Sequence, residues 1–259
     1  DTSATITNVL IYKQYPNTPF VLLATLPYDT TGLYYFSDND VATFKQSYNY
    51  FARITDNCGN EVLYSDTVRT ILLTGAGNSD NTNSLSWFPY HKFNAPVENY
   101  VIYRSIGTSM NFSSVNSTNA FTCNYMEDVT PYDRDGAIFN YYVNAVESDG
   151  NLYGFKDVSR SNIIKATQHS VTYIPNAFTP SGKNQIFKPS NIFTDPENYI
   201  FLIYGRSGTK IFETHDPNSG WDGRLNGILL PTGIYCYRVS YKNTDGTLFE
   251  KEGWVTLLR

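Results

Sequence analysis

The chain has 259 residues and a formal net charge of −5, with a sequence pI near 5.2. This charge leaves no basic surface that would neutralise a phosphate backbone, so nucleic acid is excluded as an expected partner. Tyrosine (22) and phenylalanine (16) far outnumber methionine (2), which is typical of half-buried pleated strands. No run approaches the roughly 20 apolar residues of a membrane-spanning helix. We therefore expect an all-β chain without a membrane-spanning segment.

An internal repeat organises the first two thirds of the chain. Residues 8–13 (NVLIYK) recur as residues 99–104 (NYVIYR), a shift of 91 positions from Ile11 to Ile102. Residues 48–53 (YNYFAR) match residues 139–144 (FNYYVN) at the same shift. Turn residues bound these alternating segments, which is typical of β-sandwiches. The repeat therefore predicts two modules of one architecture.

The strand at residues 48–54 and its copy resemble the strand of fibronectin type III and related immunoglobulin-like modules that carries a packed tyrosine. Trp87, in the second module, is similar to the core tryptophan of that family. The 91-residue shift places Asp1 opposite Lys92, beyond Trp87, so we expect the first module to lack its first strands. Cys58 would then have a disulfide partner upstream. Gly75 to Gly77 are expected to form a hinge between the modules.

Residues 169–259 follow a different pattern from the repeat. Pro175-Asn176-Ala177-Phe178-Thr179-Pro180 opens this part, and Gly220-Trp221-Asp222-Gly223 predicts a turn in which Asp-Gly suits a tight hairpin. Pro231-Thr232-Gly233 leads into a strand whose odd positions, from Tyr235 to Tyr241, share one face. A turn is expected at residues 244–246, before a last strand that ends in Leu257, Leu258 and Arg259.

Four segments carry a resemblance that spans nearly all of residues 171–259: Pro175–Pro180, Gly220–Gly223 followed by Gly227, Pro231–Tyr235 and Val255–Arg259. In this order they resemble the gliding motility-associated C-terminal domain, the type B sorting domain of proteins exported by the type IX secretion system. The sequence departs from the family at residues 181–185 (SGKNQ), which lack its aspartates, and at residues 204–208 (YGRSG), which lack its tryptophan. The resemblance implies a folded signal that an outer-membrane translocon and its shuttle protein read, after which the protein is placed on the cell surface or released.

The residues that match the family's motifs are the candidate signal residues. We expect the last strand to be a free edge that can add to a partner's sheet, although each residue has the alternative of only shaping the module. The candidates are Pro175, Asn176, Ala177, Phe178, Thr179, Pro180, Gly182, Trp221, Asp222, Gly223, Gly233, Tyr235, Leu257, Leu258 and Arg259.

Catalytic and cofactor motifs are missing from the sequence. His91, His169 and His215 lie far apart, as do Cys58 and Cys123, and no nucleophile elbow, zinc-binding helix or phosphate-binding loop occurs. We expect no enzymatic activity and no cofactor. Weak candidates for calcium ligands are Asp38 and Asp40, for which turn chemistry is the alternative. The aromatic excess would also suit a surface glycan bound by the second module, which predicts exposed coplanar tyrosines.

Together these features predict three tandem immunoglobulin-like β-sandwich modules, the first truncated at its N-terminus. The boundaries are residues 1–74 and 75–168 for the fibronectin type III-like modules and residues 169–259 for the sorting domain. The expected function is that of the C-terminal region of an adhesin-like or gliding-related surface protein, with spacer modules and an export signal. The alternative is the tail of a secreted hydrolase or carbohydrate-binding protein whose functional domain lies upstream.

Overall fold

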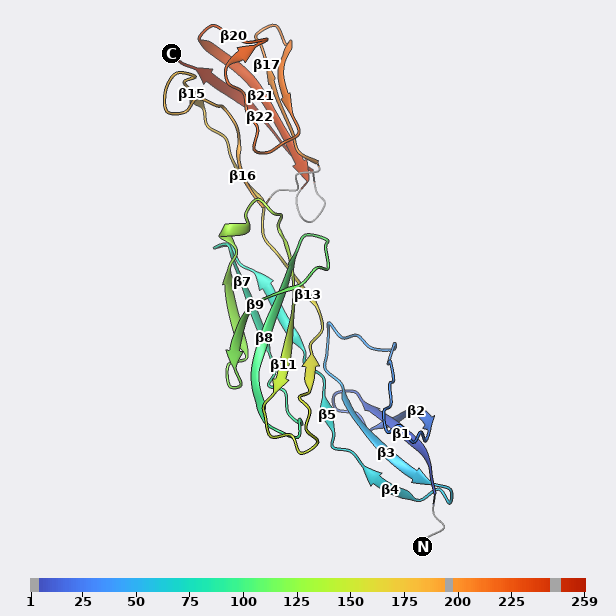
Figure 1. The fold of residues 1–259 in the computed structure, drawn as a ribbon. Helices are drawn as coiled ribbons and strands as arrows, with labels where there is room; N and C mark the ends of the chain where they lie inside the picture. Colours follow the sequence, from blue (N-terminus) through green and yellow to red (C-terminus); the bar gives the residue numbers. More distant parts are fainter. Residues whose placement is uncertain (1–4, 194–197, 243–247) are drawn as a thin grey trace.

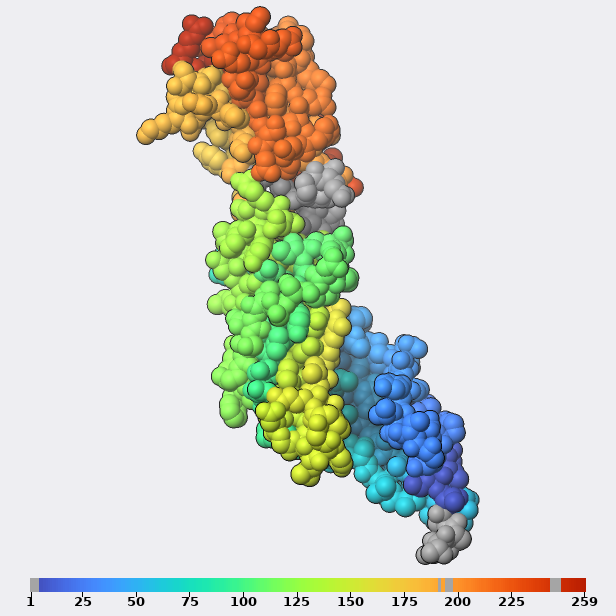
Figure 2. Space-filling view, in the orientation of Figure 1, coloured from blue at the N-terminus to red at the C-terminus, as the bar shows by residue number. Residues whose placement is uncertain are grey.

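The computed structural model describes residues 5–193, 198–242 and 248–259. Within these ranges the chain forms β-strands, the 3-10 turn η1 (Thr130–Tyr132) and no α-helix. The sheets follow one another along a long axis, with the strands of the first and third modules at opposite ends of the molecule (Figure 1, Figure 2). The predicted all-β fold is confirmed.

The first module contains one sheet of five strands, in the order β2-β1-β3-β4 with β5 also paired to β3. These strands are β1 (Ile6–Gln14), β2 (Val21–Pro27), β3 (Asn49–Asp56), β4 (Glu61–Tyr64) and β5 (Val68–Arg69). Among the residues that the structure describes, no second sheet packs on this one. As a result Ile11 and Ala52 are only half-buried.

Two sheets face each other in the second module, as in fibronectin type III and related immunoglobulin-like sandwiches. One sheet contains β6 (Leu73–Gly77), β7 (Thr82–Trp87) and β10 (Asn124–Asp128). The other contains β8 (Val97–Ile106), β9 (Ser113–Asn119), β11 (Ile138–Glu147), β12 (Val158–Arg160) and β13 (Ile164–Thr167). Trp87, Tyr100 and Val143 lie in the core between them. Ile102 and Val143, at the repeat positions of Ile11 and Ala52, are fully buried here.

The predicted hinge at Gly75 and Gly77 is wrong. Both glycines lie in β6, which pairs with β7 in a regular antiparallel register. A Cβ atom on Gly75 would overlap the carbonyl oxygen of Ser84, and one on Gly77 would overlap the carbonyl oxygen of Thr167. The glycines therefore allow the backbones of neighbouring strands to approach closely, which is a packing role and not a flexible one.

The third module is built on a five-stranded sheet in the order β15-β22-β21-β17-β18. Its strands are β15 (Ala177–Phe178), β17 (Ile200–Tyr204), β18 (Lys210–Thr214), β21 (Gly233–Lys242) and β22 (Leu248–Leu257). Two small sheets accompany it, formed by β14 (Val171–Tyr173) with β16 (Ser190–Ile192) and by β19 (Arg224–Leu225) with β20 (Ile228–Leu229). Tyr235, Tyr237, Val239 and Tyr241 are all buried on one face of β21, as predicted. The expected turn at residues 244–246 lies outside the described residues.

Two local predictions in the third module are corrected by the strand pairing. Gly223 has a left-handed φ of 82°, but the tight hairpin between β19 and β20 is closed by Asn226 and Gly227, with φ values of 51° and 81°. Positive φ at both central residues suits a type I′ hairpin. The last strand is not a free edge along its whole length, because Thr256 and Leu257 of β22 pair with β15.

A segment of the third part of the chain packs into the second module. Phe193, which directly follows β16, is fully buried in the same hydrophobic cluster as Phe139, and their ring centroids are 6.3 Å apart. The Phe193 N–H donates to the carbonyl oxygen of Asp133 at 2.6 Å, and the Ser170 hydroxyl donates to the carbonyl oxygen of Phe193. This aromatic side chain therefore anchors the third module to the second.

Candidate functional site

The first and last predicted signal segments are joined by a short parallel strand pair. Ala177 and Phe178 of β15 lie opposite Thr256 and Leu257 of β22. The Thr256 N–H donates to the carbonyl oxygen of Asn176, and the Leu258 N–H donates to that of Phe178, both at 2.9 Å. Parallel pairing requires two distant segments to be brought together by the rest of the fold. The opening and closing segments therefore come together only in the folded module.

An aromatic cluster connects the two middle segments to this strand pair. The Trp221 side chain is fully buried, with ring centroids 5.3 Å from Phe178 and 4.9 Å from Tyr235. Its Nε1–H donates to the carbonyl oxygen of Arg224 at 3.0 Å, and the Tyr235 hydroxyl donates to that of Pro231 at 2.7 Å. Both polar atoms are satisfied, so the rings pack without a desolvation penalty.

Two of the candidate glycines are required by close contacts in the same region. A Cβ atom on Gly223 would lie 2.9 Å from the side chains of both Leu257 and Pro180. A Cβ atom on Gly233, whose φ is 150°, would lie 2.6 Å from a guanidinium nitrogen of Arg206. Because a larger residue would displace these neighbours, the glycines bring the four segments together.

The candidate residues divide into those that form the core and those that face solvent. Phe178, Trp221, Gly223, Tyr235 and Leu257 are buried, so they determine the shape of this end of the module. The other candidates are half-buried or exposed. The exposed ones are Asn176, Asp222, Leu258 and Arg259, and the half-buried ones are Pro175, Ala177, Thr179, Pro180, Gly182 and Gly233. The four segments thus meet at the end of the module farthest from the second module (Figure 1).

A comparison with protein families identifies the domain in which these segments lie. Residues 172–257 match the CHU_C type IX secretion signal domain. The secretion signal domain thus covers β14 to β22, including all four predicted segments except the last two residues. It indicates export across the outer membrane to the cell surface or the extracellular space. No helix among the described residues has the length and hydropathy of a membrane span.

Two solved structures of tandem domains align weakly with this chain. A tetra-tandem repeat in the extending region of a large adhesion protein shares 13% identity, with 97% of this chain and 67% of that chain covered and a TM-score of 0.36. The chicken CNTN1 FN1–FN3 domains share 12% identity, with 100% of this chain and 91% of that chain covered and a TM-score of 0.28. No curated protein matches the sequence.

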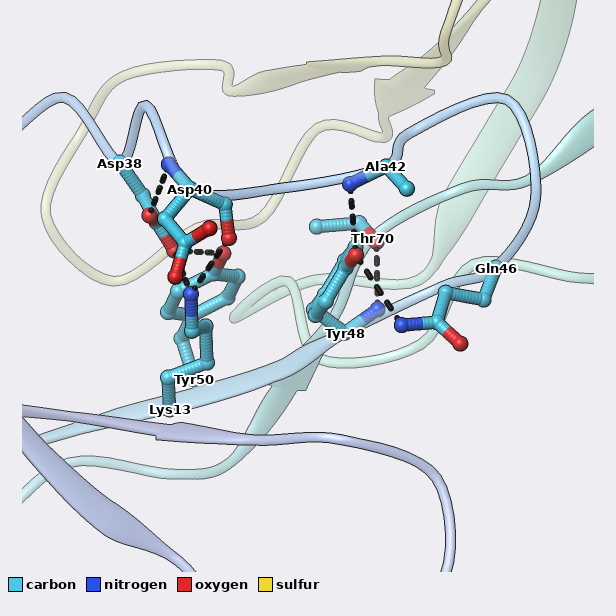
Figure 3. A network of polar contacts seen from close by, with 8 residues as sticks. All are labelled: Lys13, Asp38, Asp40, Ala42, Gln46, Tyr48, Tyr50 and Thr70. Atoms are coloured by element: carbon cyan, nitrogen blue, oxygen red, sulfur yellow. Dashed lines mark hydrogen bonds and ion pairs between the residues drawn. The ribbon is translucent and has the colours of Figure 1, made fainter.

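Outside the secretion signal domain, Asp38 and Asp40 take part in a polar network of the first module (Figure 3). The Lys13 ammonium lies 2.8 Å from the Asp38 carboxylate and donates to the carbonyl oxygen of Asp40. The Tyr50 hydroxyl and the Asp40 N–H also donate to Asp38. Burial by itself would raise the pKa of Asp38, but its hydrogen bonds from Lys13 and Tyr50 lower that pKa below the ordinary value. Both carboxylate oxygens of Asp38 are thus engaged by donors of the chain itself, whereas Asp40 takes part in the network through its backbone N–H and carbonyl oxygen.

The Lys13, Asp38 and Tyr50 triad of the first module has a counterpart in the second module, again made of a basic residue, a carboxylate and a tyrosine. Arg104 pairs with Glu127, whose carboxylate also accepts a hydrogen bond from the Tyr141 hydroxyl at 2.6 Å. Arg104 and Tyr141 lie at the repeat positions of Lys13 and Tyr50. The internal repeat indicates part of this triad, because the basic residue and the tyrosine match at the 91-residue shift. The carboxylates do not match at that shift. These triads join strands within each module. Within the described ranges no group of three or more His, Cys, Asp or Glu side chains is placed to hold a metal ion.

The three cysteines are separate thiols in the described structure. Cys58 and Cys236 are exposed, and Cys123 is half-buried. Burial raises the pKa of the Cys123 thiol, which lowers its reactivity. The proposed upstream disulfide partner of Cys58 therefore stays a prediction, and the exposed position of Cys58 in the turn after β3 is compatible with it.

Proposed function

We propose that this chain is part of an exported surface protein in which the first two modules are spacers and the third is a folded export address. The observation that supports the address most strongly is the meeting of four separate sequence segments at one end of the secretion signal domain. Since Trp221, Gly223 and Leu257 are buried there, a partner would read the surface that they shape and not a linear peptide. The proposed readers are an outer-membrane translocon and its shuttle protein.

An adhesin-like or gliding-related protein is our favoured setting for this address. Two features support spacer modules: the sheets follow one another in an elongated arrangement (Figure 2), and Phe193 anchors consecutive modules. The buried charged residues Lys13, Arg104 and Glu127 serve packing within the modules. The alternative of a hydrolase with an upstream catalytic domain would use the same address, because an export signal says nothing about the activity of its cargo.

Export of a reporter tests the proposed address. A periplasm-targeted fluorescent protein fused to residues 70–259, which include all of β6 and the buried Ile71 and Leu73, should reach the surface or medium of a bacterium with type IX secretion. The same fusion ending at residue 168 should stay in the periplasm. Equal export of both fusions, or retention of both, would contradict the proposal. Residues 70–168 are kept in both fusions because they contain the second module, into which Phe193 packs.

Glycan binding by the second module is a second candidate, favoured by one loop. The Glu147 carboxylate is buried and accepts hydrogen bonds from the Ala95 N–H, the Asn151 side chain and the Asp157 N–H. Burial would raise the pKa of Glu147, but these donors hold it below its ordinary value. The carboxylate thereby joins the loop before β8 to the loop after β11, so both are held in place.

Two aromatic rings are presented by the second of these loops. Tyr153 and Phe155 are 71% and 51% exposed, with centroids 6.2 Å apart and planes within 20° of parallel. Such rings suit stacking on sugar faces, although they are one tyrosine and one phenylalanine in place of the expected tyrosines. We expect the chain to bind to a bacterial surface-glycan array and the Tyr153→Ala/Phe155→Ala variant to lose this binding. Unchanged binding by that variant, or no binding by the parent, would rule out this candidate.

A further inference from the structure

The end of the third module where the signal segments meet is basic, in contrast to the acidic chain as a whole. Residues 175–184, 205–209, 221–235 and 255–259 contain four basic side chains and one carboxylate side chain. All five are exposed. The basic residues are Lys183, Arg206, Arg224 and Arg259, and the acidic residue is Asp222. The formal net charge of the full chain is −5, so this end opposes the overall charge.

Backbone and packing contacts bring the segments that carry these basic residues next to Leu257. Gly233 lies opposite Leu257 in the β21–β22 pair, and the Arg206 guanidinium packs against Gly233. Gly223, which precedes Arg224, packs against Leu257 and Pro180. Arg259 follows Leu257 by two residues, and Lys183 lies in the turn that follows Pro180. The four basic residues therefore lie on chain segments that meet next to Leu257.

Most of this charge is not neutralised within the module. Among the described residues, no carboxylate lies within ion-pair distance of Lys183, Arg206 or Arg259, and Arg224 is 3.8 Å from Asp222. By contrast, Lys210 and Arg238 of the same domain pair with Glu213 and Glu250. Cations left without partners on one face attract a surface of opposite charge and raise its association rate.

Apolar side chains are also exposed on the segments that carry the basic residues. Ile228 is 72% exposed, Ile234 54% and Leu258 46%. Ile228 lies in the β19–β20 hairpin, Ile234 at the start of β21, and Leu258 directly after β22. An apolar centre with a charged rim is the usual anatomy of a protein-binding surface.

We propose that this basic end docks onto an acidic protein surface of the export machinery. This inference rests on the proposed function, since it names the chemistry of the partner that reads the address. A protein partner is favoured over an anionic lipid surface because rigid contacts fix the positions of the charges. Arg206 is held against Gly233, and Arg224 donates to the carbonyl oxygen of Gly227 at 3.0 Å.

Charge reversal within the full chain tests the proposal. The variant Lys183→Glu/Arg259→Glu is compared with Lys242→Glu/Lys251→Glu, which makes the same change in net charge at exposed positions elsewhere on the domain. Binding of each to detergent-purified type IX translocon is measured at low and high salt. We expect the first variant to bind about 10-fold or more weakly at low salt and to lose most of the salt dependence of the parent. The control should stay within about 2-fold of the parent.

Further measurements separate folding, lipid binding and the function itself. Arg206→Lys keeps the charge and should bind the translocon like the parent, whereas Arg206→Glu should bind more weakly. The melting temperatures of all variants should match that of the parent. Equal translocon binding by the parent and the Lys183→Glu/Arg259→Glu variant would overturn the proposal. A loss confined to phosphatidylglycerol vesicles would overturn it in favour of a lipid surface. If the parent reporter fusion is exported and the reversed one is exported equally well, only this inference fails; if the parent is retained, the proposed function fails.

Discussion

Replacing Phe193 by alanine is expected to destabilise the second module, although Phe193 lies within the secretion signal domain. The side chain is fully buried in the cluster that contains Phe139 and Trp87. Removing a buried phenylalanine leaves a cavity that a close-packed core fills only in part, which typically costs about 3–5 kcal/mol. Hydrogen exchange measured on peptides from β8 and β11 should report this loss in the free energy of opening.

A matched control separates burial from the loss of an aromatic ring. Phe121 belongs to the second module and is 96% exposed, so Phe121→Ala should change the free energy of opening by less than about 0.5 kcal/mol. If Phe193→Ala left exchange in β8 and β11 unchanged and affected only the third module, the anchoring role of Phe193 would be wrong.

The second large effect is expected for Glu127→Gln in the buried triad of the second module. This substitution leaves the Arg104 guanidinium, which is also buried, without its carboxylate. Removing one partner of a buried ion pair typically costs about 3–5 kcal/mol, because the remaining charge stays out of water. Urea unfolding, monitored by hydrogen exchange in β8 and β11, measures the change in the free energy of unfolding.

Two further variants test the cause of this loss. Glu98→Gln removes an exposed pair with Lys156 and should cost less than about 1 kcal/mol. Arg104→Met/Glu127→Gln removes the buried charge that Glu127→Gln leaves behind, so it should recover part of the stability. If the double variant were less stable than Glu127→Gln alone, the penalty would not come from the unpaired guanidinium.

Features set by local sequence pattern could be predicted. The repeat located β1 with β8 and β3 with β11, and alternation along β21 identified its buried face from Tyr235 to Tyr241. Each of these predictions depends on the two-residue period of a strand and on turn residues nearby. The sequence also locates the four segments that resemble the family's motifs, and the structure adds that they meet at one end; their role as signal residues stays a prediction.

Features set by long-range contacts could not be predicted. The Gly75–Gly77 segment is typical of a hinge in sequence, but the nearby backbones of Ser84 and Thr167 require glycine there. The pairing of β15 with β22 joins residues far apart in the chain, so the pattern of the last strand alone predicts a free edge. Phe193 carries no local signal of the module into which it packs.

The most direct test of the central claim asks whether the export address is a fold or a linear sequence. Val239 is fully buried in β21 and belongs to none of the four signal segments. In the reporter fusion of residues 70–259, Val239→Asp buries an unpaired charge and unfolds the domain while every signal segment keeps its sequence. Lys242→Asp, at an exposed position of the same strand, is the control. We predict that the Val239→Asp fusion stays in the periplasm and that the control is exported; export of the Val239→Asp fusion at the parent level would contradict the account.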